Sequence, residues 1–207
     1  LSSEFDCIFR STRVDRFTLA LGGRHNISNA LSVIALGLTL GIEVKFIRLA
    51  LRNYKGADRR LDTKYKDSRY WIIDDYAHHP TEIRATLEAV KSLGRKRVIA
   101  IFQPHRYSRT KLLLDEFGSC FDLADKVILT DIYAAGETPL PGADSGSLYD
   151  KIKEHAPDKD VFLLPKEQIA GHILELIEPD DLVITLGAGD IVKVSELLSE
   201  NLKKGAA

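Results

Sequence analysis

Methionine is absent from all 207 positions of the sequence, and the first residue is leucine. Because translation starts with methionine, we expect a processed or truncated piece of a longer chain. Long apolar runs are also absent, since no stretch approaches the ~18 residues that a membrane-spanning helix needs. The first residues lack the basic-then-apolar pattern of a signal peptide. We therefore expect no membrane insertion.

The sequence has only two cysteines and a net charge close to zero. Cys7 and Cys120 are far apart and lack metal-ligand spacing, so neither a disulfide framework nor a cysteine metal site is expected. Two buried thiols are typical of a reducing compartment, which predicts a cytoplasmic location. A net charge of -1 gives no bulk reason to expect nucleic acid or an acidic membrane as a partner. Small anionic substrates are compatible with this balance, because local clusters hold them.

The first quarter of the chain differs in pattern from the rest. Its expected elements are strands over 5–10 and 16–21 and helices over 27–41 and 44–54. The first helix is indicated by Ile27, Leu31, Ile34 and Leu38, which recur at three- and four-residue spacing, and Gly41 is a plausible end. The polar stretch Lys55-Gly56-Ala57 follows, and we interpret it as a domain boundary that divides 1–57 from 58–207.

Strands and helices alternate after this boundary. The expected strands are 70–75, 97–102, 126–130, 161–164 and 182–186. The expected helices are 80–93, 107–121, 147–155, 166–177 and 191–201. Alternation at these lengths predicts an α/β fold of the Rossmann-like kind, with a mostly parallel sheet and helices on both faces.

Polar clusters follow four of the expected strands. They occupy residues 74–82, 103–109, 130–137 and 187–190. Ligands of open α/β sheets bind beyond the carboxyl ends of the strands. One such cluster could be chance, but four at the same edge of the sheet indicate a ligand site.

Arg106 and Arg109 lie one helical turn apart at the expected start of a helix, so both can project from one face. Beside a helix N-terminus they could hold a carboxylate or a phosphate. The alternative is a solvated helix start with surface arginines. The other polar clusters at this edge favour the anion site.

The remaining motifs leave alternatives open. His78 and His79 could bind a metal, but adjacent residues seldom face the same way, so a substrate contact by one of them is favoured. Asp75 could accept hydrogen bonds from a ribose or cap the following turn. The sequence Gly187-Ala188-Gly189 lacks the third glycine of a dinucleotide fingerprint.

Two further segments favour nucleotide binding. Asn26 and Asn29 share a helix face, and a carboxamide pairs with the donor and acceptor edges of a purine. Helix capping could explain Asn26 but not Asn29, which lies one turn inside the helix. Arg59 and Arg60, just past the boundary, would suit a polyphosphate.

Taken in order, these segments resemble the Mur ligases, three-domain ATP-dependent enzymes that form amide bonds in peptidoglycan precursors. The segment from Gly23 to Asn29 is similar to the family's adenine-contacting segment at the end of the central ATPase domain. Arg59-Arg60 is similar to the interdomain segment whose second arginine reaches the ATP phosphates. The resemblance thus implies ATP-binding roles for His25, Asn26, Asn29 and Arg60.

Residues 74–82 are similar to the DDYxHHPTE signature of the family, whose second Asp, here Asp75, holds the ribose of ATP. The segment FQPHRYSR at 102–109 resembles the amino-acid pocket of the member that adds L-alanine to UDP-N-acetylmuramic acid. Residues 131–137 and 187–190 match later blocks of that member. The resemblance implies an amino-acid pocket of Tyr76, His78, His105, Arg106 and Arg109. It implies catalytic roles for Arg60, His78, Arg106 and Arg109.

The implied reaction uses ATP to convert the carboxylate of UDP-N-acetylmuramic acid into an acyl phosphate, which the amine of L-alanine attacks. The family's GKT-type phosphate loop and the Glu and His that hold Mg²⁺ are absent here, as is the amino-terminal domain for the UDP-sugar. We therefore expect 1–57 to be the end of the central ATP-binding domain and 58–207 to be the carboxyl-terminal domain. Such a fragment is expected to be inactive alone, with Mg²⁺ held elsewhere.

Two other functions are alternatives. The recycling ligase that attaches a whole tripeptide to the same sugar nucleotide should vary in its amino-acid pocket, and the intact FQPHRYSR block counts against it. A dinucleotide-dependent oxidoreductase would need a full GxGxxG that opens a βαβ unit, and this pattern is missing.

Overall fold

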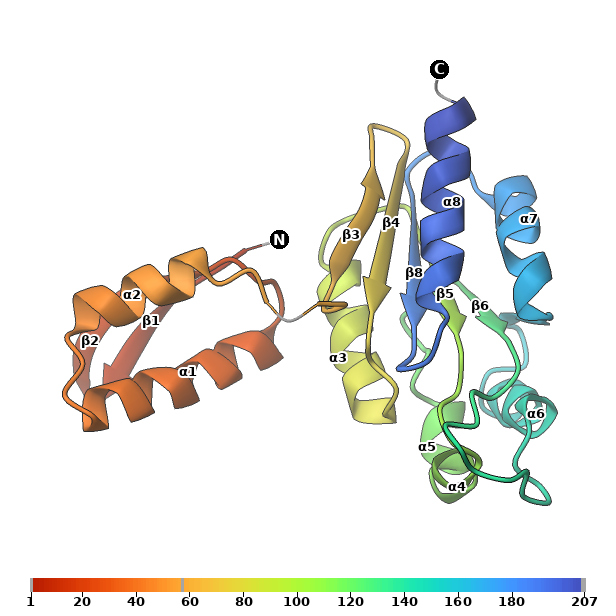
Figure 1. Ribbon diagram of the computed structural model, residues 1–207, viewed down its shortest axis with the longest axis horizontal. Helices are drawn as coiled ribbons and strands as arrows, with labels where there is room; N and C mark the ends of the chain where they lie inside the picture. Colours follow the sequence, from red (N-terminus) through yellow and green to blue (C-terminus); the bar gives the residue numbers. More distant parts are fainter. Residues whose placement is uncertain (1, 57, 206–207) are drawn as a thin grey trace. The chain divides into compact units, whose positions relative to one another are not determined.

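The computed structural model describes residues 2–56 and 58–205, and the chain divides into two compact units, Leu1–Asp58 and Arg59–Ala207 (Figure 1). The boundary expected from the sequence lies one residue away from this division. Each unit has its own hydrophobic core and is described by itself.

The first unit consists of a hairpin and two helices. Its strands β1 (Ser3–Phe9) and β2 (Thr12–Leu19) pair in antiparallel fashion, and α1 (Arg24–Thr39) and α2 (Val44–Asn53) follow. The core of this unit contains Cys7, Phe17, Leu19, Ala30, Ile34, Ile47 and Leu51. The predicted apolar stripe of α1 is only partly buried, because Ile34 is 1% exposed while Leu31 and Leu38 are 41% and 36% exposed.

The second unit is built on a six-stranded sheet in the order β3-β4-β8-β5-β6-β7. The strands are β3 (Asp62–Lys66), β4 (Tyr70–Asp75), β5 (Arg97–Phe102), β6 (Lys126–Leu129), β7 (Asp160–Leu163) and β8 (Asp181–Leu186). All neighbouring strands are parallel except β3, which pairs antiparallel with β4. The predicted α/β fold with a mostly parallel sheet is confirmed.

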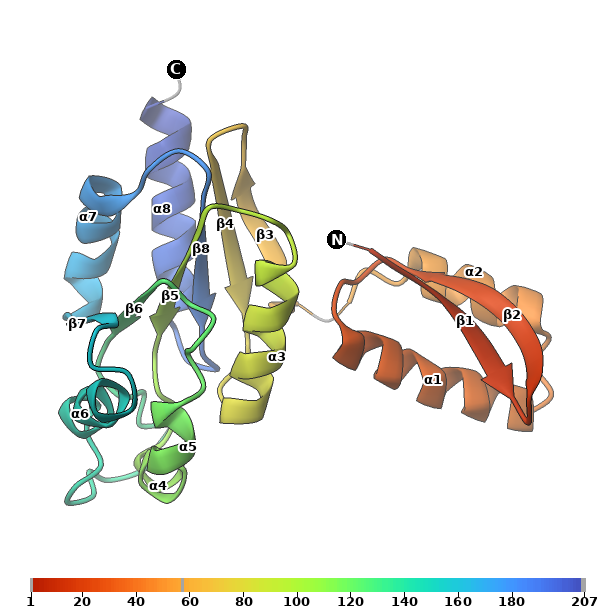
Figure 2. The same cartoon turned by 180° about the vertical axis from the view of Figure 1, so that it is seen from behind.

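Helices cover both faces of this sheet. One face packs against α3 (Pro80–Lys91), α5 (Leu114–Gly118) and α6 (Ser145–His155), and the other against α7 (Lys166–Leu176) and α8 (Val192–Gly205). The two opposite views show α8 in front of the sheet in Figure 1 and α3 in front in Figure 2.

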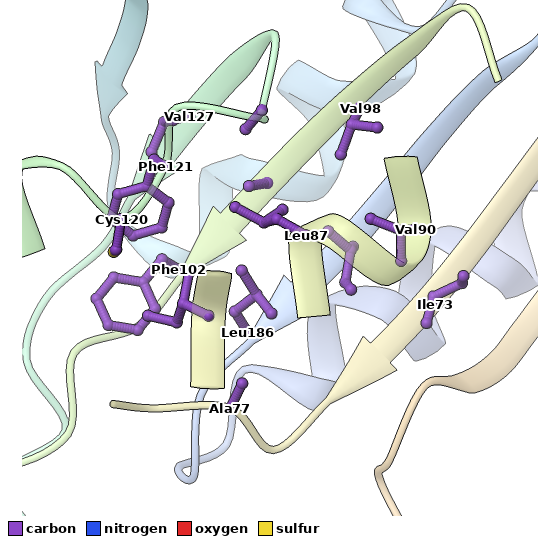
Figure 3. Close-up of a cluster of buried hydrophobic side chains, with 14 of the residues drawn as sticks. Ile73, Ala77, Leu87, Val90, Val98, Phe102, Cys120, Phe121, Val127 and Leu186 are labelled. Atoms are coloured by element: carbon purple, nitrogen blue, oxygen red, sulfur yellow. The ribbon is translucent and has the colours of Figure 1, made fainter. Parts of the chain in front are cut away.

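The alternation of side chains along β5 supplies both cores. Val98 and Phe102 contact the first face, where Leu87, Phe121 and Leu186 complete the cluster shown in Figure 3. Ile99 and Ile101, which are also fully buried, point to the second face. A parallel strand covered on both faces has to be apolar at nearly every position, which is why the sequence pattern located it.

Two expectations for the second unit were wrong. Strand β3 was missed because its sequence, Asp-Thr-Lys-Tyr-Lys, is too polar to resemble a buried strand. The helix expected over 107–121 is interrupted at Leu113, which separates α4 (Tyr107–Leu112) from α5. Among the described helices, none combines the length and the apolar character required to cross a bilayer.

Candidate functional site at the carboxyl edge of the sheet

The polar clusters lie at one edge of the sheet because the strands before them end at the same level. Asp75 of β4 is in register with Leu186 of β8, and Leu186 is in register with Phe102 of β5, which aligns with Leu129 of β6. These four strands are consecutive neighbours in the sheet. The loops after them therefore share one rim, as the order of motifs predicted.

Arg59 is tied into this rim by four hydrogen bonds. Its guanidinium bonds both oxygens of Asp74, at 2.8 and 3.4 Å, and the carbonyls of Gly187 and Gly189, at 2.7 and 2.9 Å. The Asp74 carboxylate is fully buried and also accepts from the Thr185 hydroxyl at 2.6 Å. Arg59 therefore joins the glycine loop after β8 to the end of β4.

Arg60 contrasts with its neighbour. Its side chain is 41% exposed, and its nearest acidic atoms are Oδ1 of Asp75 at 4.0 Å and Oε1 of Glu82 at 3.8 Å. The guanidinium carbon lies 5.7 Å from the ring centroid of Tyr76. Arg60 thus keeps its donors available for an external anion, whereas those of Arg59 are largely occupied.

Asp75 is 2% exposed, and its carboxylate accepts hydrogen bonds from residues of this chain. Its carboxylate accepts from the backbone N–H of Leu61 and of Ala77, each at 2.8 Å, and from the hydroxyl of Thr86 at 3.4 Å. Burial raises the pKa of Asp75, although the two backbone hydrogen bonds and Arg60 act in the opposite direction. A carboxylate offers about four acceptor positions, so a ribose would share Asp75 with these donors.

The adjacent histidines have different surroundings. His79 is the N-cap of α3, where Nδ1 accepts from the N–H of Thr81 at 3.3 Å. His78 places Nδ1 2.9 Å from the carbonyl oxygen of Tyr76 and 3.6 Å from Oε2 of Glu82. Within residues 2–56 and 58–205, no group of three or more His, Cys, Asp or Glu side chains is arranged to hold a metal ion.

His105 lies at the centre of an aromatic and cationic cluster. Its ring stacks on Tyr133 with centroids 5.6 Å apart, and the ring of His78 is 5.7 Å away. Nη1 of Arg109 is 3.3 Å from Nδ1 of His105. Burial, followed by the charge of Arg109 and the neighbouring His78 and Arg106, lowers the pKa of His105. The imidazole is therefore held in its neutral form near neutral pH.

Arg106 differs from the expectation that it projects from the first turn of a helix. It is the N-cap residue of α4, and its φ of 73° lies in the left-handed region that non-glycine residues seldom adopt. Its N–H donates to the carbonyl of Tyr133 at 2.9 Å, and its carbonyl accepts from Thr110. This backbone strain costs of order 1–3 kcal/mol and is typical of functional sites.

The start of α4 already holds an anion. Glu137 accepts from the N–H of Ser108 at 3.0 Å and from its hydroxyl at 2.6 Å. These hydrogen bonds lower the pKa of Glu137. The expectation that this helix start leaves its N–H groups for a substrate anion was therefore incomplete, and an external carboxylate would depend on the guanidinium groups of Arg106 and Arg109.

The glycine loop after β8 closes tightly on Gln103. A Cβ atom at Gly189 would lie 2.4 Å from Oε1 of Gln103 and 2.7 Å from Cγ of Tyr133. Asp190 accepts from Nε2 of Gln103 at 3.0 Å and from Lys166 at 2.6 Å. Burial opposes ionisation of Asp190, but its contacts with Lys166 and Gln103 prevail and lower its pKa.. The loop thus serves as a packed wall of the rim.

The other nucleotide candidates lie in the first unit. Asn26 is in the first turn of α1, and its amide donates to the carbonyl of Gly22 at 2.8 Å. His25 is half-buried and Asn29 is exposed one turn further along. The N-cap residue of α1 is Gly23, and the helix has no side-chain cap hydrogen bond, so the capping explanation for Asn26 was wrong.

Several rim residues were not singled out by the sequence reasoning. They are Glu82, Gln103, Tyr133, Glu137 and Lys166. All except Lys166 lie inside or beside a motif, but their partners come from other strands and loops. Only Glu82, three residues after the His79 N-cap, has a local signal, since Glu at this position often bonds backbone N–H groups before a helix.

The second unit is thus an α/β domain that places arginines and histidines at the carboxyl edge of a mostly parallel sheet. The sequence profile described as "Mur ligase, glutamate ligase domain" matches residues 59–189. This match covers more than half of the chain, which therefore belongs to the Mur ligase family.

Curated relatives agree over nearly the whole chain. The UDP-N-acetylmuramate–L-alanine ligase of Anaeromyxobacter dehalogenans is 45% identical over 196 residues, which cover 94% of this chain and 43% of that protein. The enzyme of the same name from Geotalea uraniireducens is 42% identical over 202 residues, covering 98% of this chain and 44% of that protein. The chain spans less than half the length of these relatives.

Solved structures show the same fold. The UDP-N-acetylmuramate-alanine ligase MurC from Thermotoga maritima superposes with a TM-score of 0.79 at 28% identity, covering 96% of this chain and 42% of that one. A murein peptide ligase from Psychrobacter arcticus gives a TM-score of 0.68 at 25% identity, covering 91% and 39%.

Proposed function

We propose that this chain is the carboxyl-terminal part of an ATP-dependent ligase of peptidoglycan precursor synthesis that joins L-alanine to UDP-N-acetylmuramic acid. The observation that carries the proposal is the match to ligases of this name over 94% of the chain, combined with the rim of arginines and histidines. ATP activates the sugar carboxylate as an acyl phosphate, and the role of this chain is to present the amine that attacks it.

The amino-acid pocket comprises Tyr76, His78, His105, Arg106 and Arg109. Arg109 donates to His105, and the backbone of Arg106 is held by hydrogen bonds with Tyr133 and Thr110. Guanidinium groups form strong charge-assisted hydrogen bonds with carboxylates, so these two would hold the carboxylate of alanine. The neutral ring of His105 adds no further charge to the pocket, and the rings of Tyr76 and His78 limit its size.

The residues proposed for ATP are divided between the two units. His25, Asn26 and Asn29 belong to the first unit, and Arg60 and Asp75 belong to the second. The exposure of Asn29 and the unoccupied donors of Arg60 support contacts with an external group. Arg60 would neutralise phosphate charge, which stabilises a transition state in which that charge shifts.

The described residues do not fit a magnesium site, because they bring no three acidic or histidine side chains together. In the proposed enzyme the metal ligands belong to another part of the protein.

We also propose that residues 1–57 are the end of a larger ATP-binding domain. Apolar side chains on both helices of the first unit are exposed, including Val33, Leu36, Phe46 and Leu49 at 54–61%. A helix that is apolar on several faces usually packs on more than one side.

The buried free thiols Cys7 and Cys120 support a reducing, cytoplasmic location.

The decisive experiment supplies the full-length protein with ATP, Mg²⁺, UDP-N-acetylmuramic acid and either L-alanine or the murein tripeptide. We expect phosphate release and one amide product with alanine, and little with the tripeptide. An amide product with the tripeptide and none with alanine would assign the recycling activity instead. Absence of both products would contradict the proposal.

A further inference from the structure

The tautomer of His78 is determined by its backbone partner. Nδ1 lies 2.9 Å from the carbonyl oxygen of Tyr76, and a carbonyl can only accept a hydrogen bond. Nδ1 must therefore carry the proton. In the neutral ring the other nitrogen, Nε2, is then an unprotonated acceptor, and it has no hydrogen-bond partner among the described residues.

Glu82 holds this histidine from the first turn of α3. Oε2 accepts from the backbone N–H of His78 at 3.1 Å and lies 3.6 Å from its Nδ1. The start of a helix favours a carboxylate at this position. A positive charge that formed on the His78 ring would thus lie beside an anion, while the ring itself keeps a fixed orientation.

The ring of His78 lies beside two other rings of the proposed amino-acid pocket, those of Tyr76 and His105. Its centroid is 5.7 Å from that of His105, and His105 in turn contacts Arg109. Because Nδ1 of His105 accepts from Arg109, the neutral His105 ring carries its proton on Nε2. His105 is therefore arranged to position the arginine, whereas His78 retains a free basic nitrogen.

We propose that Nε2 of His78 is the general base of the ligation and that Glu82 is its positioning residue, an inference that rests on the proposed function. The α-ammonium of the incoming amino acid gives one proton to Nε2, so an N–H bond breaks and an Nε2–H bond forms. The neutral amine attacks the acyl phosphate and forms the C–N bond. Inorganic phosphate leaves as the C–O bond breaks, and the second amine proton departs with it or passes to water.

Charged groups of both signs lie near His78. Oε2 of Glu82 is 3.6 Å from Nδ1 of the ring that receives the proton, whereas the guanidinium groups of Arg59 and Arg60 lie over the ring of Tyr76, 5.2 and 5.7 Å from its centroid. His105 is neutral and separates His78 from Arg109. Positioned general bases contribute about 10²- to 10⁴-fold to rate.

The test compares two nucleophiles in the full-length ligase. Alanine is protonated near neutral pH and needs a base, whereas hydroxylamine is largely unprotonated and traps the acyl phosphate without one. His78→Gln should lower kcat/KM for alanine about 100-fold at pH 7 and change hydroxamate formation less than about threefold. The defect should shrink as the pH rises towards the pKa of the alanine amine.

The controls are His79→Asn and Glu82→Gln. His79→Asn keeps a cap acceptor on α3 and should leave both reactions unchanged. Glu82→Gln should lower kcat for alanine about tenfold with little change in its KM and spare hydroxylamine, because the carboxylate acts on this step through His78.

Three outcomes decide the inference. Equal loss with alanine and hydroxylamine, or no loss with either, would overturn the general-base role while leaving the proposed function intact. A wild-type enzyme that forms no amide would instead refute the proposed function. If His78→Gln does not fold, ¹⁵N NMR of the wild-type 207-residue chain still decides: an unprotonated Nδ1 in the neutral ring contradicts the inference, and an unprotonated Nε2 supports it.

Discussion

The guanidinium of Arg59 and the carboxylate of Asp74 form a buried ion pair, with Nε 2.8 Å from Oδ2. The next residue, Arg60, has no ionic contact shorter than 3.8 Å within the part of the chain that the structure describes. Two adjacent arginines therefore have separate tasks: one holds the rim together and the other is available to a ligand.

Arg59→Ala should destabilise the second unit by about 3–5 kcal/mol, because it leaves the Asp74 charge buried without its partner. Arg60→Ala should change the free energy of unfolding by less than about 1 kcal/mol. The only tryptophan, Trp71, lies in β4 and is buried, so its fluorescence during urea unfolding reports this unit. Equal destabilisation by both substitutions would contradict the division of tasks.

Arg109→Ala in the full-length enzyme should raise the KM for alanine about 30- to 150-fold, since a charge-assisted contact of ~2–3 kcal/mol is lost. The KM for ATP should change far less. Arg84→Ala removes an exposed arginine that bonds Ser119 on the neighbouring helix, and it provides the matched control. Equal effects on both substrates would show that the amino-acid pocket lies elsewhere.

His105 should make the second unit less stable as the pH falls. Its folded-state pKa is lowered, so below the ordinary value of about 6.5 the unfolded chain binds a proton that the folded chain does not. Stability therefore decreases as the pH drops from about 6.5 through the folded pKa. His105→Gln should remove this component of the pH dependence in urea unfolding.

NMR titration of the His105 Cε1 proton gives a second measurement. Arg109→Ala should raise the pKa of His105 towards its ordinary value, because one lowering charge is removed. An unchanged titration would mean that the charge of Arg109 contributes little and that burial, the largest cause, dominates.

Gly189→Ala should destabilise the rim, because its methyl group would collide with Gln103 and Tyr133. We expect a loss of about 1–3 kcal/mol, the usual cost of overpacking. Gly171→Ala, in α7, meets no atom within 4 Å and should instead stabilise by about 0.5–1 kcal/mol. Thermal unfolding of the two variants makes the comparison, and a neutral Gly189→Ala would show that the loop has room.

ATP should bind the 207-residue chain weakly, with a Kd in the millimolar range. The sequence contains no GKT-type phosphate loop, and a wall for adenine and ribose provides few contacts. Calorimetry with ATP tests this. Micromolar binding would mean that the loop does not supply most of the affinity.

The sequence predicted the parallel strands of the second unit well, because β4, β5 and β8 are buried at nearly every position and are therefore apolar or motif-bearing. The sequence pattern did not predict elements whose formation depends on tertiary contacts. Strand β3 forms at the edge from polar residues, and the break before α5 has no proline or glycine to signal it.

The site likewise has features that the sequence predicted and features that it did not. Clustering of His78, His105 and Arg109 at one edge followed from motif order and from the geometry of parallel strands. The pairing of Arg59 with Asp74, and of Ser108 with Glu137, joins residues 15 and 29 positions apart, and no spacing rule relates them. Opposite charges far apart in a sequence have too many alternative partners to be matched without coordinates.

The place of β8 in the sheet has a consequence for synthesis. It is the last strand in the chain, yet it lies between β4 and β5, near the middle of the sheet. Until Asp181–Leu186 has left the ribosome, those two earlier strands have no shared neighbour, and the backbone N–H and C=O groups along the edges that β8 joins remain unpaired. The second unit should therefore fold only when nearly all of it has been made. A chain that stops before residue 181 should be a target for chaperones and proteases.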